Sequence, residues 1–361
     1  MTHRVVVIPG DGIGPEVIDA ALRVLEATGV PFEWEVHEAG RVAVAQGRPA
    51  LPDEVLAAIG RTSVAIKGPV STPIGRTGFR SVNVALRRQL GLFAQVRPCR
   101  TLAGTAARFS DVDLVVIRDT TEDLYAGVEF EARSPGAADV IEASRRSGEV
   151  TIPEAAGISV KFTSEEASRR VVRFAFEYAR RNGRRKVTAV HKASVMRATD
   201  GLFLEVAREV ASEFTDLEFA DELVDNACGR LVQRPEDFDV LVMANFYGDI
   251  VSDLAAGLTG GVGVAPGANY GPDVAVFEPG HGTAPAHAGR NDADPVAAIL
   301  SGAMMLDHLG ERSAAERVRA AIAAVVGAGE SVTYDLRPDR SVDGAVGTAE
   351  MTAAIASRVR I

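Results

Sequence analysis

Short β-branched runs alternate with segments of helical periodicity along the first part of the chain. Residues 5–8 form such a run, and apolar residues then recur at helical spacing between Pro15 and Gly29. The same order returns with a strand-like run at 32–36, a helical stretch at 52–59 and a run at 63–66. Strands that alternate with helices predict an α/β fold with a substantially parallel sheet.

The rest of the chain continues this pattern, with one interruption. Further strands are predicted at 113–117, 186–190 and 239–244, and further helices at 165–181, 202–212, 250–258, 295–309, 314–326 and 349–359. Residues 126–163 differ because they mix Gly, Ser, Pro and charged residues with short β-like runs at 149–152 and 158–162. We expect an arm or hairpin layer there. A length of 361 residues favours one large or two closely joined domains.

Composition excludes several classes of function. No run of about 18 apolar residues is present, so we expect no membrane span. The net charge of −10 disfavours nucleic acid as a partner. The two cysteines form no CxxC pair, and the N-terminus carries no signal peptide pattern, so we expect a reducing cytoplasm. An acidic chain that binds an anionic substrate must cluster its cations locally.

A glycine-rich loop, Gly10-Asp11-Gly12-Ile13-Gly14, lies between the first predicted strand and helix. Its GxGxG spacing departs from the GxGxxG of a dinucleotide-binding fingerprint, and no acidic partner follows at the usual distance. The loop therefore favours a tight turn between strand and helix.

Four arginines, Arg80, Arg87, Arg97 and Arg118, are candidates for anion binding. Arg87 lies on a predicted helix with Ser81 and Asn83 near its start, where backbone amides and polar side chains can hold a carboxylate. Arg97 and Arg118 end predicted strands and can converge on one polycarboxylate. The alternative for each is a solvated surface arginine.

Three aspartates are candidates for a Mg²⁺ or Mn²⁺ site. Asp249 and Asp253 share one face of a predicted helix, and Asp225 follows a separate strand. Carboxylate oxygens are the ligands that these ions prefer. The alternative is a set of helix-terminal and surface acids.

Two possible proton donors and one rigid loop complete the candidates. Tyr125 and Lys192 can move protons, with a packed tyrosine and a solvated lysine as alternatives. The loop from Glu278 to Pro285 contains His281 and could hold an adenosine, although alone it indicates only a structured loop.

In this order the motifs resemble the β-decarboxylating dehydrogenases, which include isocitrate, isopropylmalate, homoisocitrate and tartrate dehydrogenases. The similarity extends from the glycine loop to the helix predicted at 295–309, through the segments Tyr247-Gly248-Asp249-Ile250-Val251-Ser252-Asp253 and His281-Gly282-Thr283-Ala284-Pro285. The resemblance implies a two-domain fold with a large mixed parallel and antiparallel sheet flanked by helices. Residues 1–97 and 256–361 would form the large cofactor-binding domain and residues 98–255 the small domain. The arm at about 126–163 would interlock a homodimer with shared active sites.

The resemblance also implies roles for individual residues. Tyr125 and Lys192 would be catalytic, with Lys192 supplied by the partner subunit, and Asp225, Asp249 and Asp253 would hold the metal. The substrate would contact Ser81, Asn83, Arg87, Arg97, Arg118 and Ser194. The cofactor would contact Ile13, Thr72, Glu278, His281, Gly282, Thr283, Ala284, Ala286, His287 and Asp294. The implied reaction is the metal-dependent oxidative decarboxylation of isocitrate or a close 2-hydroxy tricarboxylate analogue, with hydride transfer to NAD(P). Homoisocitrate, isopropylmalate, tartrate and a phosphonomethylmalate are the alternative substrates.

Single residues narrow the choice of substrate and the choice of cofactor. Ser81 and Asn83 favour isocitrate over isopropylmalate, which needs apolar residues there. Ser194 and Thr120 depart from the isocitrate pattern, where Asn is usual, so homoisocitrate or a phosphonomethylmalate are alternative substrates. Ala286 and His287 match neither cofactor pattern; we expect NAD, with NADP as the alternative.

Two other classes of protein compete with this interpretation. One is a non-catalytic regulatory subunit, which would have no need of Lys192, Tyr125 and the three aspartates. The other is an unrelated phosphate-binding α/β protein, which would leave the arginines and aspartates unexplained.

Overall fold

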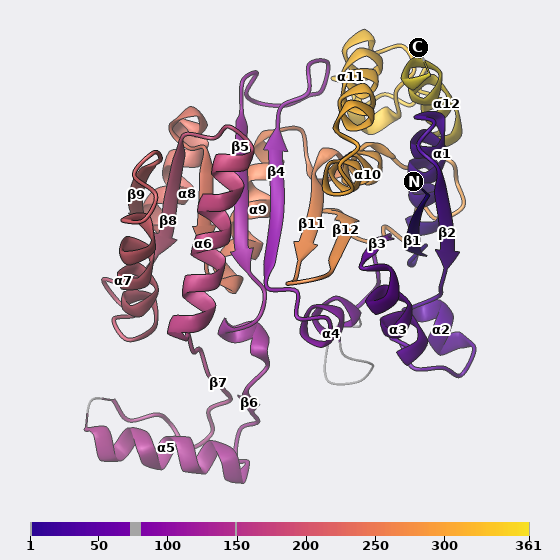
Figure 1. Cartoon of the computed structure of the whole chain (residues 1–361). Coiled ribbons are helices and arrows are strands. Elements are labelled where there is room, and N and C mark those ends of the chain that lie inside the picture. The colour runs from indigo at the N-terminus through magenta and orange to yellow at the C-terminus, as the bar shows by residue number, and fades with distance from the viewer. Residues whose placement is uncertain (1, 73–80, 149, 361) are drawn as a thin grey trace.

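The computed structural model describes residues 2–72, 81–148 and 150–360, and most of its strands form one mixed sheet (Figure 1). The ten strands of this sheet lie in the order β2-β1-β3-β12-β11-β4-β5-β10-β8-β9. Their bounds are β1 (His3–Ile8), β2 (Phe32–Val36), β3 (Val64–Lys67), β4 (Ala94–Arg100), β5 (Asp113–Asp119), β8 (Lys186–His191), β9 (Glu218–Leu223), β10 (Val240–Met243), β11 (Pro266–Tyr270) and β12 (Ala275–Pro279). The predicted fold class, a mixed sheet flanked by helices, is therefore confirmed.

Strand direction changes in the middle of the sheet. The outer strands pair in parallel, as in β1 with β2 and β3 and in β8 with β9 and β10. The central pairs β12–β11, β11–β4 and β4–β5 are antiparallel. Strands β11 and β12 are joined by a short turn in which Gly271 N donates to Val274 O at 2.8 Å, and such a turn permits only antiparallel neighbours.

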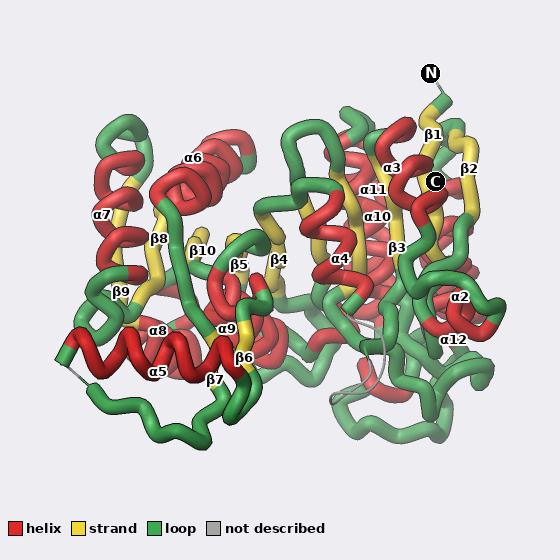
Figure 2. Tube along the Cα trace, turned by 90° about the horizontal axis from the view of Figure 1, so that it is seen from below, coloured by secondary structure: helices red, strands yellow, loops and turns green. Residues whose placement is uncertain are grey.

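Helices cover both faces of the sheet. Their bounds are α1 (Gly14–Ala27), α2 (Arg41–Ala45), α3 (Asp53–Thr62), α4 (Val82–Gln89), α6 (Glu165–Arg181), α7 (Thr199–Ala211), α8 (Val224–Gln233), α9 (Asn245–Leu258), α10 (Val296–His308), α11 (Arg312–Ala328) and α12 (Thr348–Val359). Figure 2 shows α6 and α7 on one face of the strands β5, β10 and β8, and α8 and α9 on the other. Helices α1, α10, α11 and α12 pack together over the opposite half of the sheet.

An arm extends away from the body of the molecule (Figure 1). It consists of β6 (Glu129–Phe130) paired with β7 (Ile158–Ser159) and of helix α5 (Pro135–Ser147). The expected β-like run at 149–152 is wrong for residues 150–152, which carry no strand, and residue 149 lies outside the described residues. Helix α5 ends just before this run. Ser134 caps the start of α5 by accepting the amide of Ala137 at 3.2 Å.

The glycine loop after β1 forms the expected tight turn. Gly10 and Gly12 have φ values of +82° and +63°, a region that favours glycine. The loop lies against a second loop, because Ile13 N donates to Thr283 O at 2.9 Å and a Cβ on Gly12 would overlap that carbonyl. The N-terminal loop and the loop after β12 are therefore held together.

The proposed domain boundaries fall inside regular elements. The boundary at 97/98 lies in β4 and that at 255/256 lies in α9, and the sheet continues through both segments. The division into two domains stays a prediction. Among the described residues, no helix combines the length and the apolar character that crossing a membrane requires.

Candidate active site

Helix α9 presses against the end of strand β5 and brings an aspartate onto an arginine. Arg118, whose side chain is 2% exposed, forms an ion pair through Nη1 with Oδ1 of Asp249. The backbone approach is close because residue 248 is glycine; a Cβ there would overlap the side chain of Arg118. One predicted substrate residue and one predicted metal ligand are thus brought together.

A second pair lies one turn further along α9. Arg97 Nη1 lies 2.5 Å from Oδ1 of Asp253 and donates to Ser252 Oγ at 2.9 Å. The Asp253 side chain is 59% exposed while that of Arg97 is 12% exposed. The carboxylate therefore reaches the open side of the site while the guanidinium lies below it.

The proposed proton donor contacts the same aspartate. The hydroxyl of Tyr125 donates a hydrogen bond to Oδ2 of Asp249. Tyr125 lies in the single-turn 3₁₀ helix η1 (Asp123–Ala126), and Arg118 stacks over its ring at 5.5 Å. Burial and the carboxylate of Asp249 raise the pKa of Tyr125 to about 12, so the phenol keeps its proton near neutral pH.

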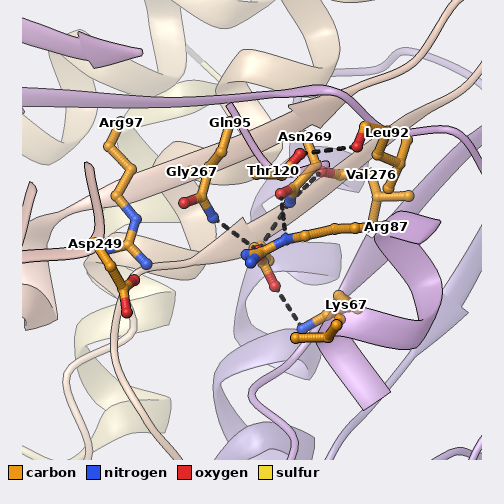
Figure 3. Close-up of polar contacts among 12 residues, drawn as sticks. Lys67, Arg87, Leu92, Gln95, Arg97, Thr120, Asp249, Gly267, Asn269 and Val276 are labelled. Carbon is orange, nitrogen blue, oxygen red and sulfur yellow. Dashed lines mark hydrogen bonds and ion pairs between the residues drawn. The ribbon is translucent and has the colours of Figure 1, made fainter. Parts of the chain in front are cut away.

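Arg87 is held in place by a buried polar network (Figure 3). Its Nε donates to Asn269 Oδ1 at 3.0 Å, and its Nη2 lies 3.2 Å from Oε1 of Glu278. Lys67 Nζ lies 2.6 Å from the other carboxylate oxygen, and Gln95 and Asn269 also donate to Glu278. Glu278, expected to bind cofactor, therefore makes its contacts with Lys67 and Arg87 and fixes the guanidinium.

The arginines create an excess of positive charge in a buried place. Burial and then the neighbouring Arg87 lower the pKa of Arg118 to about 10, and Arg97 adds to the effect. The Nε atoms of Arg97 and Arg118 are buried and have no hydrogen-bond partner among the described residues. Clustered guanidinium groups with unmet donors suit an anion with several carboxylates.

The polar residues of α4 lie on the same helix as Arg87. Ser81 caps the helix by accepting the amide of Val84 at 3.5 Å, as expected for a residue near its start. Asn83 lies one turn before Arg87, and its Oδ1 is buried and without a partner in the described part of the chain. Arg80, also a candidate, lies outside the described residues.

Lys192 and Asp225 form a separate pair. Lys192 Nζ lies 2.5 Å from Oδ1 of Asp225, which is in the first turn of α8. Ser194 is exposed nearby and lines an open cavity of about 640 Å³ with His191, Asn226 and Arg208. No hydrogen bond or ion pair among the described residues joins Lys192 or Asp225 to the group around Asp249.

The three aspartates therefore do not meet within one described chain. Across residues 2–72, 81–148 and 150–360, no three His, Cys, Asp or Glu side chains gather in a group that could hold a metal. The donor set itself suits a hard cation, because all three carboxylates are at least 37% exposed and two share a helix face. A second copy must supply Asp225 if the three act together.

The loop after β12 carries most of the predicted cofactor residues. Thr283 faces Ile13 and lies 3.4 Å from Ser71 Oγ, beside the exposed Thr72. His281 Nδ1 lies 2.9 Å from the carbonyl of Gly282, while its Nε2 is buried without a partner among the described residues. Burial lowers the pKa of His281, so the ring is neutral near pH 7.

The far end of this loop is different in character. Ala284 and Ala286 are exposed, and His287 pairs with Asp292 at 3.1 Å and stacks on Tyr334. Asp294 is buried, accepts the amide of Val296 at 2.9 Å and has one oxygen without a partner in the described chain. Burial and then Asp335 raise the pKa of Asp294 well above its usual range, so it adds less negative charge than an exposed aspartate.

Sequence reasoning missed the residues that hold the site from behind. Lys67, Gln95 and Asn269 support Arg87 through Glu278, and Ser252 supports Arg97. Only the scarcity of lysine, with four residues in the chain, singles out Lys67 in the sequence.

Guanidinium groups facing a pair of helix-borne aspartates, on a mixed sheet flanked by helices, are the features of an enzyme that binds anionic substrates. A family model for isocitrate/isopropylmalate dehydrogenase matches residues 4–355. The chain belongs to this family.

Individual relatives agree with this assignment. A catalytic subunit of mitochondrial NAD isocitrate dehydrogenase from Arabidopsis thaliana is 43% identical over 348 residues, or 96% of this chain and 86% of the relative. A chloroplastic 3-isopropylmalate dehydrogenase from Solanum tuberosum is 42% identical and covers 91% of this chain and 86% of the relative. The crystal structure of isocitrate dehydrogenase from Methylococcus capsulatus has a TM-score of 0.90 and 47% identity, and covers 99% of this chain and 100% of that one.

The comparisons bear on two other expectations. The name of the Arabidopsis relative agrees with the expected cofactor, NAD. The two relatives are mitochondrial and chloroplastic proteins, so the expected cytoplasmic location stays a prediction.

Proposed function

We propose that this protein oxidatively decarboxylates isocitrate with NAD and a divalent metal, as a homodimer whose active sites combine residues of both subunits. The observation that carries the proposal is the row of contacts along α9, where Arg118 and Tyr125 meet Asp249 and Arg97 meets Asp253. Cation donors for a polycarboxylate and carboxylate donors for a metal are adjacent there. Names of relatives favour isocitrate over its homologues.

Each residue has a chemical task in this proposal. In this proposal the substrate carboxylates bind Arg87, Arg97 and Arg118. The Nδ2 group of Asn83 donates a hydrogen bond to one of these carboxylates. Asp249 and Asp253, with Asp225 of the other subunit, hold Mg²⁺ or Mn²⁺, which when bound polarises the 2-hydroxyl oxygen of the substrate.

Proton and hydride transfers follow in order. Lys192 from the other subunit would assist deprotonation of the 2-hydroxyl, and NAD, held by the loop after β12, would supply the acceptor for the hydride of C2. The 2-oxo acid then loses its 3-carboxylate as CO₂. Tyr125 donates a proton to C3, which completes the 2-oxo product. The raised pKa of Tyr125 suits a donor that is protonated at neutral pH.

A panel of 2-hydroxy acids tests the proposal. Isocitrate, homoisocitrate, isopropylmalate, tartrate and a phosphonomethylmalate are each supplied with NAD or NADP and with Mg²⁺ or Mn²⁺. The expected result is fastest nicotinamide reduction with isocitrate and NAD, abolished by a chelator. Faster turnover of isopropylmalate would contradict the substrate, and no reduction with any acid would support a non-catalytic subunit.

A further inference from the structure

A buried charge cluster at the root of the arm has no role in the reaction described above. Lys161 Nζ lies 2.8 Å from Oδ1 of Asp200 and 3.7 Å from Oδ1 of Asp123. The two aspartate side chains are 3% and 2% exposed and the lysine is 14% exposed. One ammonium group thus faces two carboxylates in a place with little water.

Asp200 connects this cluster to the loop of Lys192. Its Oδ2 accepts the backbone amide of Lys192 at 2.7 Å, directly after strand β8 ends. Asp200 lies in the first turn of α7, so the carboxylate joins that helix to the residue that is proposed to act as a base. The ammonium of Lys161 faces the other oxygen of this carboxylate and fixes its orientation.

Asp123 connects the cluster to the turn of Tyr125. It begins η1, two residues before the tyrosine, and has a φ of +69°, which is unfavourable for a residue other than glycine. Its Oδ2 accepts the amide of Phe246 at 2.8 Å, in the first turn of α9. Its Oδ1 has no hydrogen-bond partner in the described chain, and Lys161 is the cation that faces it.

Helix α9 completes the enclosure. The ammonium of Lys161 lies 4.4 Å from the ring centre of Tyr247, which precedes Asp249 by two residues. The hydroxyl of Tyr247 contacts Sδ of Met196 at 3.8 Å, in the segment between Lys192 and α7. Lys161 therefore contacts groups that are joined to the segments of Tyr125, Lys192 and Asp249.

We propose that Lys161 is a positioning residue that sets the Lys192 loop and the Tyr125 turn against helix α9. This inference rests on the proposed function. Because Lys192 would act in the partner's site and Tyr125 in its own, one Lys161 would serve both active sites of the dimer. A displacement of about 1 Å in a catalytic group can lower turnover by about 100-fold, so loss of the ammonium should be seen mainly in kcat.

The test compares Lys161→Met, Lys161→Arg and a matched control, Lys186→Met. Lys186 lies on the same half of the sheet and pairs with Glu218 at 3.2 Å, but its partner is 66% exposed and belongs to no proposed site. With isocitrate, NAD and saturating Mg²⁺, we expect Lys161→Met to lower kcat by about 10- to 100-fold with KM changed by less than about threefold. Lys161→Arg should recover most of kcat because it keeps the charge, and Lys186→Met should match the wild type.

Thermal unfolding and size-exclusion chromatography establish that each variant is folded and of wild-type size. If Lys161→Met does not fold, Lys161→Met combined with Asp123→Asn removes the carboxylate left without a cation, and low kcat is again expected. Wild-type kcat in either folded variant would overturn the inference, as would a fall in thermal stability alone. Absence of activity in the wild type would instead contradict the proposed function.

Discussion

The hydroxyl of Tyr125 donates a hydrogen bond to Oδ2 of Asp249, so a proposed proton donor rests on a proposed metal ligand. The same carboxylate pairs through its other oxygen with Arg118. Proton donor, anion-binding group and metal ligand are thus linked through the side chain of Asp249.

Tyr125→Phe removes the proton donor and leaves the ring in place. General acid catalysis typically contributes about 10²- to 10⁴-fold, so we expect kcat to fall by about 100-fold or more with KM for isocitrate nearly unchanged. Steady-state NAD reduction measures this. Tyr178→Phe, on α6 and outside the site, serves as the control, and a Tyr125→Phe enzyme as fast as that control would exclude the role.

The raised pKa of Tyr125 also predicts how the activity depends on pH. Since its pKa is about 12, the phenol remains protonated through the neutral and mildly alkaline range. The Phe variant and the wild type should therefore lose or gain activity in parallel between about pH 7 and pH 10. A wild-type loss in that range that disappears in the Phe variant would show that Tyr125 titrates there.

Mixing two inactive variants tests the shared active site. Lys192→Met and Asp253→Asn should each be nearly inactive, because each removes one group from every site. If Lys192 acts in the partner's site, random dimers of the two chains contain one intact site in every heterodimer, and about a quarter of wild-type activity should return. If both residues served the same subunit, the co-expressed mixture would stay as inactive as its parents.

Asp249→Asn should weaken the binding of the divalent metal. The amide keeps the shape of the side chain but loses the charge that attracts Mg²⁺, so half-maximal activity should require about tenfold more metal or higher. A Mn²⁺ titration of activity and of calorimetric heat measures the shift. Asp273→Asn, an exposed site in the β11–β12 turn, is the control, and equal titrations for the two variants would remove Asp249 from the metal site.

Glu278→Gln should change stability and its dependence on pH. Although burial alone would raise the pKa of Glu278, Lys67 and Arg87 hold it well below its ordinary value of 4.5. A carboxyl group with a lowered folded pKa stabilises the fold above its unfolded pKa, and that stability is lost as pH falls below it. Between about pH 5 and pH 3 the wild-type unfolding free energy should fall more steeply than that of the variant, by up to about 1.4 kcal/mol per pH unit.

The same substitution leaves two buried cations without their anion. At pH 7 we expect a loss of about 3–5 kcal/mol in the free energy of unfolding, measured with urea. Glu33→Gln is the control, because Glu33 pairs with Arg4 at the surface, where such pairs contribute about 0–1 kcal/mol. Similar losses in the two variants would show that the buried network contributes no more to the free energy of unfolding than a surface ion pair does.

Asn83→Leu tests substrate choice. The Oδ1 of Asn83 is buried and lacks a partner in the described chain, so it can accept a hydrogen bond from a donor group of the substrate, while the Nδ2 group of the same amide can donate to a carboxylate. We expect kcat/KM for isocitrate to fall by about 10- to 100-fold and that for isopropylmalate to rise. Unchanged discrimination between the two acids would place Asn83 outside the substrate pocket.

Regular elements with strong periodicity were predictable from the sequence. Helix α6 has the bounds expected, residues 165–181, because its apolar residues recur on one face between Ser164 and Asn182. Helix α5 was missed because the surrounding segment mixes Gly, Ser, Pro and charged residues, although Ser134-Pro135 at its start and Gly148 at its end are helix signals.

Contacts between distant residues were not predictable in the same way. The arginine and aspartate sets could be proposed from motif order, but Arg87 meets Glu278 across 191 positions of the chain. Such pairing depends on strands β3, β11 and β12 being neighbours, which local periodicity does not encode. The contacts of Lys161 were not predictable for the same reason, since its partners lie on η1 and α7.

The close approach of helix α9 to Arg118 on strand β5 depends on the small size of Gly248. A single added methyl group at this position would collide with Arg118 and push helix α9 outward, carrying Asp249 and Asp253 with it. The distance between Arg118 and the aspartates of α9 thus depends on the absence of a Cβ atom at residue 248. A larger residue at position 248 should therefore lower both stability and activity, so a chain of this kind that carries one there should have lost the arrangement around Asp249.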